Sequence, residues 1–383
     1  MKEKQLISIS KKHHRELIEK IKDLSNKENR SISETILSLL DIGYQEHLNK
    51  VIDDNTPMSV VSLFAGAGGL DVGVEMAGLN IIWANEVDGD ACDTFIANHP
   101  YTYIERGDIR NVRQFPNADV VIGGYPCQGF SLAGNRLVTD ERNYLYKEFL
   151  RCLRKVQPKF FIAENVKGLL TLNGGRVLEA MIEEYREEGY IVDAQLVNAK
   201  EYGVPQDRER VFIVGVRKDI NFNYKFPYPT HGEGLGMKPY ATLRDAIGHL
   251  KASEIGEYDQ SGFSSRYLSR NRKRGWDEVS FTIQASGRHA PLHPSGEPME
   301  KVDRDKWILP KTSEHRKLSY IECALIQTFP PSYIWKGSTS SIYKQIGNAV
   351  PCLLGKVIAK PMADYLRKEY RDRNTKQFEI YAQ

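Results

Sequence analysis

The sequence has few cysteines, and none of them is arranged as a structural site would require. Its 383 residues include five, with no CxxC pair and no Cys/His cluster. An odd and scattered set argues against a disulfide framework and against structural zinc. We expect Cys92, Cys152, Cys323 and Cys352 to be buried thiols. Cys127 needs separate consideration, because it ends an apolar run and begins a polar, glycine-rich loop.

Long hydrophobic runs and a strong net charge are also lacking. No window approaches the roughly 18 apolar residues of a membrane span. The amino-terminal residues carry no secretory signal, so we expect a cytoplasmic protein. The formal net charge of +3 is too small to indicate a nucleic-acid partner. Basic residues do gather at 266–274 around Tyr267 and Trp276, either to contact phosphates and bases or as a solvated basic loop.

Between residues 59 and 216, apolar segments alternate with amphipathic ones. This pattern predicts strands and helices in alternation, which is typical of a doubly wound α/β domain. The expected strands are residues 60–64, 81–85, 101–105, 119–124, 159–165, 190–198 and 210–216. From 218 to 311 the regularity ends, since glycine, proline and charged residues are frequent there. A helical pattern returns at 312–375 and indicates a return to the first domain.

The first 50 residues have a pattern of their own. A short alternating segment precedes two helical stripes, and the second stripe opens with Ser31 and Glu34 at the spacing of a capping box. Strand, helix and helix in this order resemble the ribbon-helix-helix DNA-binding module, in which two chains pair their strands. A helical extension packed on the main domain is the alternative.

The first α/β unit has the features of a cofactor site. Its strand runs into Gly66, Gly68 and Gly69, which allow backbone to approach a ligand closely. Glu86 ends the next strand, where an acid can accept ribose hydroxyls. Asp71 occupies the place of the third glycine in the dinucleotide motif and would repel a pyrophosphate. We therefore expect S-adenosylmethionine, whose sulfonium suits acidic and aromatic neighbours.

Two further residues extend this interpretation. Phe64 is an aromatic neighbour suited to the sulfonium cation. Asp108 follows the third strand and is placed to accept from an adenine amino group.

Reactive residues follow other strands at the same edge. Cys127 follows the fourth strand, and Glu164 ends the fifth, where burial should raise its pKa. Arg208 and Arg210 stand at i and i+2. Carbon 5 of a pyrimidine becomes nucleophilic when a thiolate adds at C6 and N3 is protonated. Cys127 can supply that thiolate and Glu164 that proton, while Arg208 can hold O2.

These residues resemble the DNA (cytosine-5-)-methyltransferase family. The similarity extends from about Ser59 to Ala359 and follows the family's order of motifs. The matching segments are "FAGAGGLD", "NEVD", "GDI", "GGYPCQGFS", "ENVKGL", "QDRER", "RKLSYIECALIQTFP" and "QIGNAVP". The resemblance implies a Rossmann-like methyltransferase fold, with a mixed, mostly parallel seven-stranded sheet whose last strand is antiparallel.

The resemblance also implies roles for individual residues. Cys127 would be the nucleophile, Glu164 and Arg208 would contact the cytosine, and Gln206 and Arg210 would be structural. Residues 128–142 resemble the loop that closes over flipped DNA. The implied cofactor residues are Phe64, Gly66, Gly68, Gly69, Asp71, Glu86, Asp108, Leu145 and Asn348. The implied DNA contacts are Gln128, Ser131, Arg270, Arg272, Lys273 and Arg274.

The domain organisation follows from the same comparison. We expect an amino-terminal module at 1–50, a catalytic and cofactor-binding domain at 57–217, a target-recognition domain at 218–311 and a returning segment at 312–375. The expected partner is double-stranded DNA, without metal or membrane. The catalytic part is expected to be monomeric, with dimerisation through the amino-terminal module. The expected setting is a bacterial restriction-modification system.

Three alternatives remain to be tested. A tRNA cytosine-5 methyltransferase shares these motifs, although Tyr125 stands where the tRNA relatives carry a second proline. A catalytically inactive DNA-binding regulator is disfavoured by the intact Cys127, Glu164 and Arg208. A nicotinamide oxidoreductase is disfavoured by Asp71.

Overall fold

The computed structural model describes residues 19–27, 31–32, 35, 57–126, 145–312 and 314–381. The chain divides into two compact units, Met1–Thr56 and Pro57–Gln383. In the first unit, residues 19–27 are helical, in agreement with the expected first helix. The rest of the expected ribbon-helix-helix module lies almost entirely outside the described residues.

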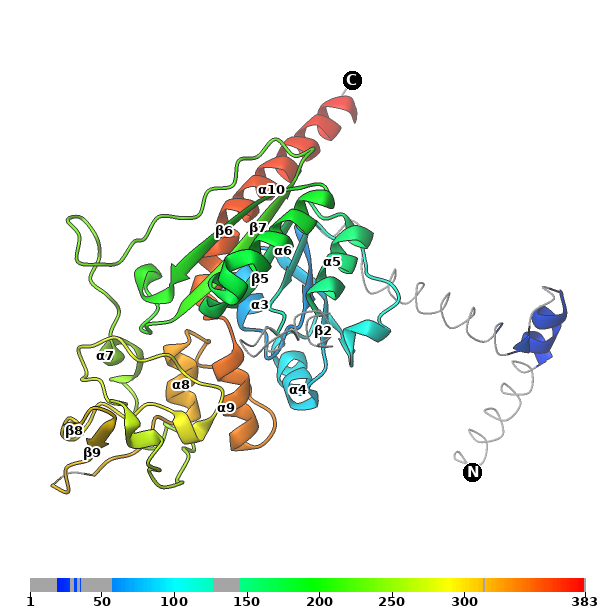
Figure 1. Cartoon of the computed structure of the whole chain (residues 1–383). Helices are drawn as coiled ribbons and strands as arrows, with labels where there is room; N and C mark the ends of the chain where they lie inside the picture. The colour runs from blue at the N-terminus through cyan, green and yellow to red at the C-terminus, as the bar shows by residue number, and fades with distance from the viewer. Residues whose placement is uncertain are drawn as a thin grey trace. The chain divides into compact units, whose positions relative to one another are not determined.

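The described part of the second unit is built on a seven-stranded sheet of order β3-β2-β1-β4-β5-β7-β6 (Figure 1). Neighbours from β3 to β5 are parallel, whereas β7 runs antiparallel to both β5 and β6. The strands are β1 (Ser59–Leu63), β2 (Asn80–Glu86), β3 (Tyr103–Arg106), β4 (Val120–Gly123), β5 (Phe160–Val166), β6 (Tyr190–Asn198) and β7 (Glu209–Arg217). All seven expected strands are present, and the sequence prediction of a mixed, mostly parallel sheet is confirmed.

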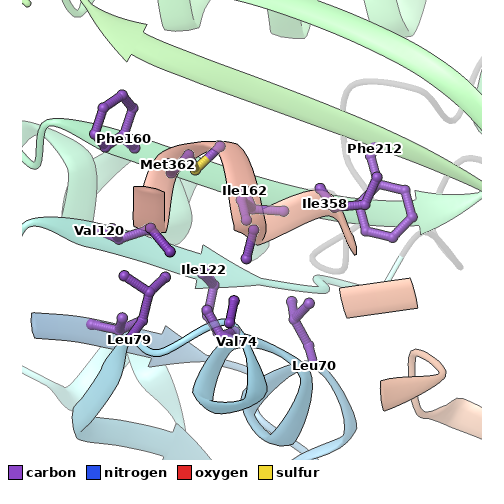
Figure 2. Close-up of a cluster of buried hydrophobic side chains, with 14 of the residues drawn as sticks. Leu70, Val74, Leu79, Val120, Ile122, Phe160, Ile162, Phe212, Ile358 and Met362 are labelled. Carbon is purple, nitrogen blue, oxygen red and sulfur yellow. The ribbon is translucent and has the colours of Figure 1, made fainter. Parts of the chain in front are cut away.

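One face of the sheet packs against α3 (Gly69–Met76) and the long α10 (Cys352–Tyr381). Figure 2 shows Leu70 and Val74 of α3 and Ile358 and Met362 of α10 in one cluster with Val120 and Ile122 of β4. The two helices touch closely, since a Cβ at Gly73 would collide with the backbone carbonyl of Cys352. A segment from the end of the chain therefore completes the first α/β unit.

The opposite face is covered by α5 (Leu145–Val156) and α6 (Arg176–Glu187). Phe149 of α5 and Tyr185 of α6 pack on Phe161 of β5, with ring centroids 5.9 and 4.8 Å away. α4 (Gly89–Asn98) connects β2 to β3. Its first turn is capped by Asp88, whose side chain accepts from the amide of Ala91.

Residues 218–311 contain little regular structure, as the sequence predicts. The described elements there are α7 (Leu243–Ile247), two short 3-10 helices, η6 (Tyr267–Ser269) and η7 (Gly287–His289), and a hairpin of β8 (Glu300–Asp303) and β9 (Lys306–Ile308). A second hydrophobic cluster joins α7 to α8 (Tyr320–Ile326) and α9 (Thr339–Asn348). These elements lie together beyond the edge of the sheet (Figure 1). The helical segment after 312 thus packs first with α7 and reaches the sheet only with α10.

The cysteines in the described part of the chain are buried free thiols, which confirms that expectation for Cys92, Cys152, Cys323 and Cys352. Among the described residues, no helix is both long and apolar enough to cross a membrane. The same residues include no cluster of three or more histidine, cysteine or acidic side chains placed to hold a metal ion.

Candidate active site

A cavity of about 880 Å³ opens at the carboxyl ends of the central strands. This edge of an open α/β sheet is where ligands bind. Of the predicted cofactor residues, eight line the cavity: Phe64, Gly66, Gly69, Asp71, Glu86, Asp108, Leu145 and Asn348. Gly68 is not among the lining residues, although it belongs to the same loop. The cavity continues to Glu164 and to the two arginines of the "QDRER" segment.

The loop after β1 has a backbone shape that its glycines make possible. Gly66 has φ 56° and Gly68 has φ 85°, in the left-handed region that glycine adopts without strain. Phe64 shares this region with φ 56°, which is uncommon for a residue with a side chain. The loop is fixed to β2, because the amide of Gly66 donates to Oε2 of Glu86 over 2.7 Å.

Glu86 is held by more than this one contact. Its Oε1 accepts from the amides of Val87 and Asp88, over 2.9 and 2.8 Å. Three backbone donors therefore orient the carboxylate at the end of β2. Since two ionised oxygens offer about four acceptor positions, the carboxylate can still accept from a ligand.

Asp71 lies in the wall of the cavity and is almost completely buried, with 1% of its surface exposed. Burial raises the pKa of its carboxyl from 3.8 to about 6, although the nearby His99 and a hydrogen bond from Ser62 act in the opposite direction. Within the described part of the chain, Oδ1 has no hydrogen-bond partner. A buried acid with a vacant acceptor is suited to a cationic ligand group.

Asp108 stands just after β3, and its carboxylate is paired with Arg110 over 2.5 Å. This hydrogen bond to Arg110 is the main cause that lowers the pKa of Asp108. The group thus stays ionised and can accept at the cavity edge. The sequence analysis gave no role to Arg110. Its position two residues after Asp108 was the only feature of the sequence that could have indicated this pairing.

Glu164 and Arg210 form the polar end of the cavity. Oε1 of Glu164 lies 3.0 Å from Nε of Arg210, and their side chains are only 10% and 15% exposed. Burial raises the pKa of Glu164, while Arg210 and then Arg208 act to lower it. A carboxyl in this environment holds a proton to a higher pH than an exposed glutamate does.

Arg208 lines the cavity, but its guanidinium is turned to the protein backbone. Its guanidinium is 99% buried and donates to three backbone carbonyls, those of Ile283, Gly347 and Ala349, over 2.8 to 3.1 Å. Only Nε has no partner among the described residues. These bonds connect the start of β7 to two distant segments. In the structure Arg210 therefore accompanies Glu164, whereas Arg208 makes the backbone contacts.

Cys127, Gln128 and Ser131 lie outside the described residues, as does the rest of 127–144. The two residues just before them, Tyr125 and Pro126, line the cavity. Asn165 donates its side-chain amide to the carbonyl of Tyr125 over 3.1 Å. The chain that leaves β4 therefore reaches the cavity wall at Pro126, the residue before Cys127.

The basic segment at 266–274 is less exposed than expected. Arg272 is 5% exposed and donates to the carbonyls of Tyr267 and His289. Lys273 is 7% exposed and donates to the carbonyl of Ser295. These hydrogen bonds tie both side chains to the protein's own backbone.

The three other basic side chains of this segment are less buried than Arg272 and Lys273. Arg274 is half-buried, lies over the ring of Phe281 and pairs with Glu278 over 3.0 Å. Arg270 is exposed, as is Arg266. Exposed guanidinium groups of the segment therefore come from these two residues.

Lys344 is a lining residue that sequence reasoning missed. Its Nζ lies 2.7 Å from Oδ2 of Asp88, so the ion pair joins α9 to the start of α4 beside the cavity. The hydrogen bond to Lys344 is the main cause that lowers the pKa of Asp88. The position of Lys344 just before "QIGNAVP" was the only signal in the sequence.

Comparisons with known proteins agree with this fold and site. A model of the C-5 cytosine-specific DNA methylase family matches residues 58–364. Type II methyltransferase M.BspRI of Lysinibacillus sphaericus is 48% identical over 354 residues, covering 82% of this chain and 83% of the relative. Type II methyltransferase M.BsuRI of Bacillus subtilis is 47% identical over 360 residues, covering 84% and 82%.

A solved structure shares the fold. It is a putative DNA modification methyltransferase encoded within an Escherichia coli prophage, with a TM-score of 0.63 and 23% identity over 81% of this chain and 99% of that chain. The matched residues of the family model include the whole cavity wall and the chain around Cys127. The chain belongs to the C-5 cytosine-specific DNA methylase family.

Proposed function

We propose that this DNA cytosine-5 methyltransferase uses S-adenosylmethionine as methyl donor and Cys127 as nucleophile. The observation that carries the proposal is the single cavity that joins the glycine loop, Glu86 and Asp71 to the Glu164–Arg210 pair. A donor and an acceptor can occupy the two ends of one cavity, which is what direct transfer between them requires.

The lining residues fit the proposed donor. S-adenosylmethionine supplies an electrophilic methyl group on a sulfonium. Asp71, buried and with Oδ1 vacant, would lie near that positive charge. Glu86 would accept from the ribose and Asp108 from the adenine. Phe64, Leu145 and the backbone of 66–69 would enclose the remainder, with Asn348 opposite.

Glu164 and Arg210 would prepare the base. The thiolate of Cys127 adds to C6 of cytosine while Glu164 places its proton on N3, so that C5 gains enamine character. Arg210 would hold O2 and offset the charge that develops there. After C5 is methylated it loses its proton to a base, and the thiol is eliminated. The raised pKa of Glu164 supports its role as proton holder.

The substrate would be a cytosine rotated out of duplex DNA. While a cytosine is stacked in the duplex, its C5 cannot reach the methyl donor and its C6 cannot reach Cys127, so the base must leave the helix. Residues 218–311 would form the target-recognition domain, and the exposed Arg266 and Arg270 would contact phosphates. The relatives named above are Type II methyltransferases, which supports a role in restriction-modification for this chain.

Two measurements test the proposal. Bisulfite sequencing of DNA from cells that express the protein should show methylated cytosines at one recurring sequence. Duplex DNA with 5-fluorocytosine at that position should form a covalent adduct with the wild-type chain and none with Cys127→Ser. Methylation of tRNA instead would identify the tRNA alternative, and absence of any methylation would favour the inactive regulator.

The amino-terminal residues 1–50 carry a separate proposal from the sequence pattern. They would pair two chains and bind DNA as a ribbon-helix-helix module, leaving the catalytic part monomeric. Deletion of 1–50 should change the oligomeric state in sedimentation and remove binding to the enzyme's own promoter. A deletion that changes neither would refute the module.

A further inference from the structure

A chain of polar side chains lies behind the glycine loop, with Tyr333 and His99 buried and Glu75 at the surface. The hydroxyl of Tyr333 donates to the backbone carbonyl of Ala67. The same hydroxyl lies 3.4 Å from Nε2 of His99, and Nδ1 of His99 lies 3.2 Å from Oε1 of Glu75. None of Tyr333, His99 and Glu75 is among the residues that line the cavity. These residues therefore act on the loop without lining the cavity that a ligand would occupy.

The pair of Tyr333 and His99 is held rigidly. Their exposed fractions are 9% and 4%. Phe95 stacks on His99 with 4.3 Å between ring centroids, and Trp335 packs on Tyr333 at 5.1 Å. This packing explains the glycine at position 68, since a Cβ there would lie 2.6 Å from Nε2 of His99 and 2.9 Å from the Tyr333 hydroxyl. Gly68 thus fits against this pair.

The loop is consequently fixed from two sides. On the cavity side, Oε2 of Glu86 accepts from the amide of Gly66. On the far side, the Tyr333 hydroxyl donates to the carbonyl of Ala67, the next residue. One contact comes from β2 and the other from a segment 266 residues further along the chain. Together they set the orientation of the peptide planes that face the cavity.

We propose that Tyr333, supported by His99, is a positioning residue that presets the cofactor loop in its binding conformation. The inference rests on the proposed use of S-adenosylmethionine. A loop ordered before binding loses less conformational entropy when the ligand arrives. Removing the hydroxyl leaves the Ala67 carbonyl buried without its donor, and the peptide plane is free to turn. Cofactor affinity should fall while the chemical step is unchanged.

Tyr333→Phe and the control Tyr343→Phe, both in the full-length chain, test this proposal. Tyr343 is also buried, and its hydroxyl donates to the carbonyl of Leu318 over 2.7 Å, away from the glycine loop. Titration calorimetry with S-adenosylhomocysteine should give a Kd about tenfold higher for Tyr333→Phe and unchanged for Tyr343→Phe. Hydrogen exchange of peptides covering 62–70 should accelerate only in Tyr333→Phe. With saturating cofactor, kcat should stay within about twofold of wild type.

Three results would overturn this proposal, and a fourth would contradict the proposed function. A Kd for Tyr333→Phe equal to that of Tyr343→Phe would overturn the positioning role, as would a lowered kcat with unchanged Kd. If Tyr333→Phe does not fold, His99→Gln tests the same chain of contacts, and an unchanged Kd and exchange rate there would also overturn it. Failure of the wild-type chain to bind S-adenosylhomocysteine would instead contradict the proposed function.

Discussion

Arg210 and Glu164 form an ion pair inside the cavity, with 3.0 Å between Nε of the guanidinium and Oε1 of the carboxylate. The neighbouring arginine, Arg208, donates to three backbone carbonyls instead. Two arginines only two residues apart therefore have different partners. Replacing Arg210 should affect activity, and replacing Arg208 should affect stability.

The first prediction separates these two arginines. Arg210→Gln should lower kcat/KM about 10- to 100-fold, since a charge-assisted contact near the substrate is lost, with little change in Tm. Arg208→Gln should lower the free energy of unfolding by about 3 kcal/mol or more, because buried carbonyls lose their donors. Steady-state kinetics and thermal unfolding of both variants provide the comparison. A stable, inactive Arg208→Gln would restore the interpretation made from sequence alone.

The second prediction concerns the proton of Glu164. Burial raises the pKa of this group, so the proton is retained at pH values where an exposed glutamate has lost it, and it leaves as pH rises further. Glu164→Gln should reduce kcat about 100-fold, since proton transfer to N3 is removed. The alkaline decline of the wild-type pH–rate profile should be absent in this variant.

Arg210→Gln provides the matched control for that profile. Arg210 lowers the pKa of Glu164, so its removal should shift the alkaline decline to higher pH. An alkaline decline that persists unchanged in Glu164→Gln would assign it to another group.

Local patterns predicted the strands well, and they placed the glycine loop at the sheet edge where the cavity opens. Each strand is an apolar run bounded by polar residues, and the glycines, Glu86 and Asp108 follow strands directly, so their common edge could be inferred. The partners of Arg208 could not, because they lie 75 to 141 residues away in sequence. The i, i+2 spacing puts both arginines on one side of a strand and does not indicate which of them pairs with Glu164.

Burial of basic residues was equally hidden from the sequence. In the sequence Arg272 and Lys273 look like part of a surface cluster, yet they donate hydrogen bonds to the carbonyls of His289 and Ser295. Gly68 is a further example, since its contacts depend on Tyr333. In each case the contacting residue is distant in the sequence, and a local pattern of residues does not predict which distant segment packs there.

The third prediction concerns Asp71. Its pKa is raised from 3.8 to about 6 by burial, so its ionised form destabilises the folded state above pH 6, and this effect fades as pH falls toward 4. Asp71→Asn should raise the free energy of unfolding of the ligand-free protein at pH 8 by an amount on the order of 3 kcal/mol, with a much smaller gain at pH 4.5. The same variant should bind S-adenosylmethionine more weakly.

Asp245→Asn serves as a control of opposite sign. The pKa of Asp245 is lowered by hydrogen bonds from Thr242 at the start of α7. Its stabilising contribution is therefore present at neutral pH and lost as pH falls below the ordinary range of an aspartate. Thermal unfolding across pH should show the two variants diverging from wild type in opposite directions. Destabilisation by Asp71→Asn at pH 8 would contradict the assignment of a buried, unfavourable charge.

The fourth prediction distinguishes exposed from buried basic residues in the region proposed to read DNA. Arg270→Ala should weaken duplex binding and reduce the slope of log affinity against log salt by about 1, because one phosphate contact is lost. Arg272→Ala should instead lower Tm, since its guanidinium lies 5.0 Å from the centre of the Tyr267 ring and donates to internal carbonyls.

Arg186→Ala is the matched control. Arg186 is an exposed arginine of α6, on the sheet face opposite α3 and α10, and it pairs with Glu183. Its salt slope should equal that of the wild type. Fluorescence anisotropy with a duplex of the methylated sequence, at salt concentrations from 50 to 200 mM, measures all three variants. An unchanged slope for Arg270→Ala would place the phosphate contacts outside this segment. A reduced slope for Arg272→Ala at unchanged Tm would show that its buried guanidinium becomes available when DNA binds.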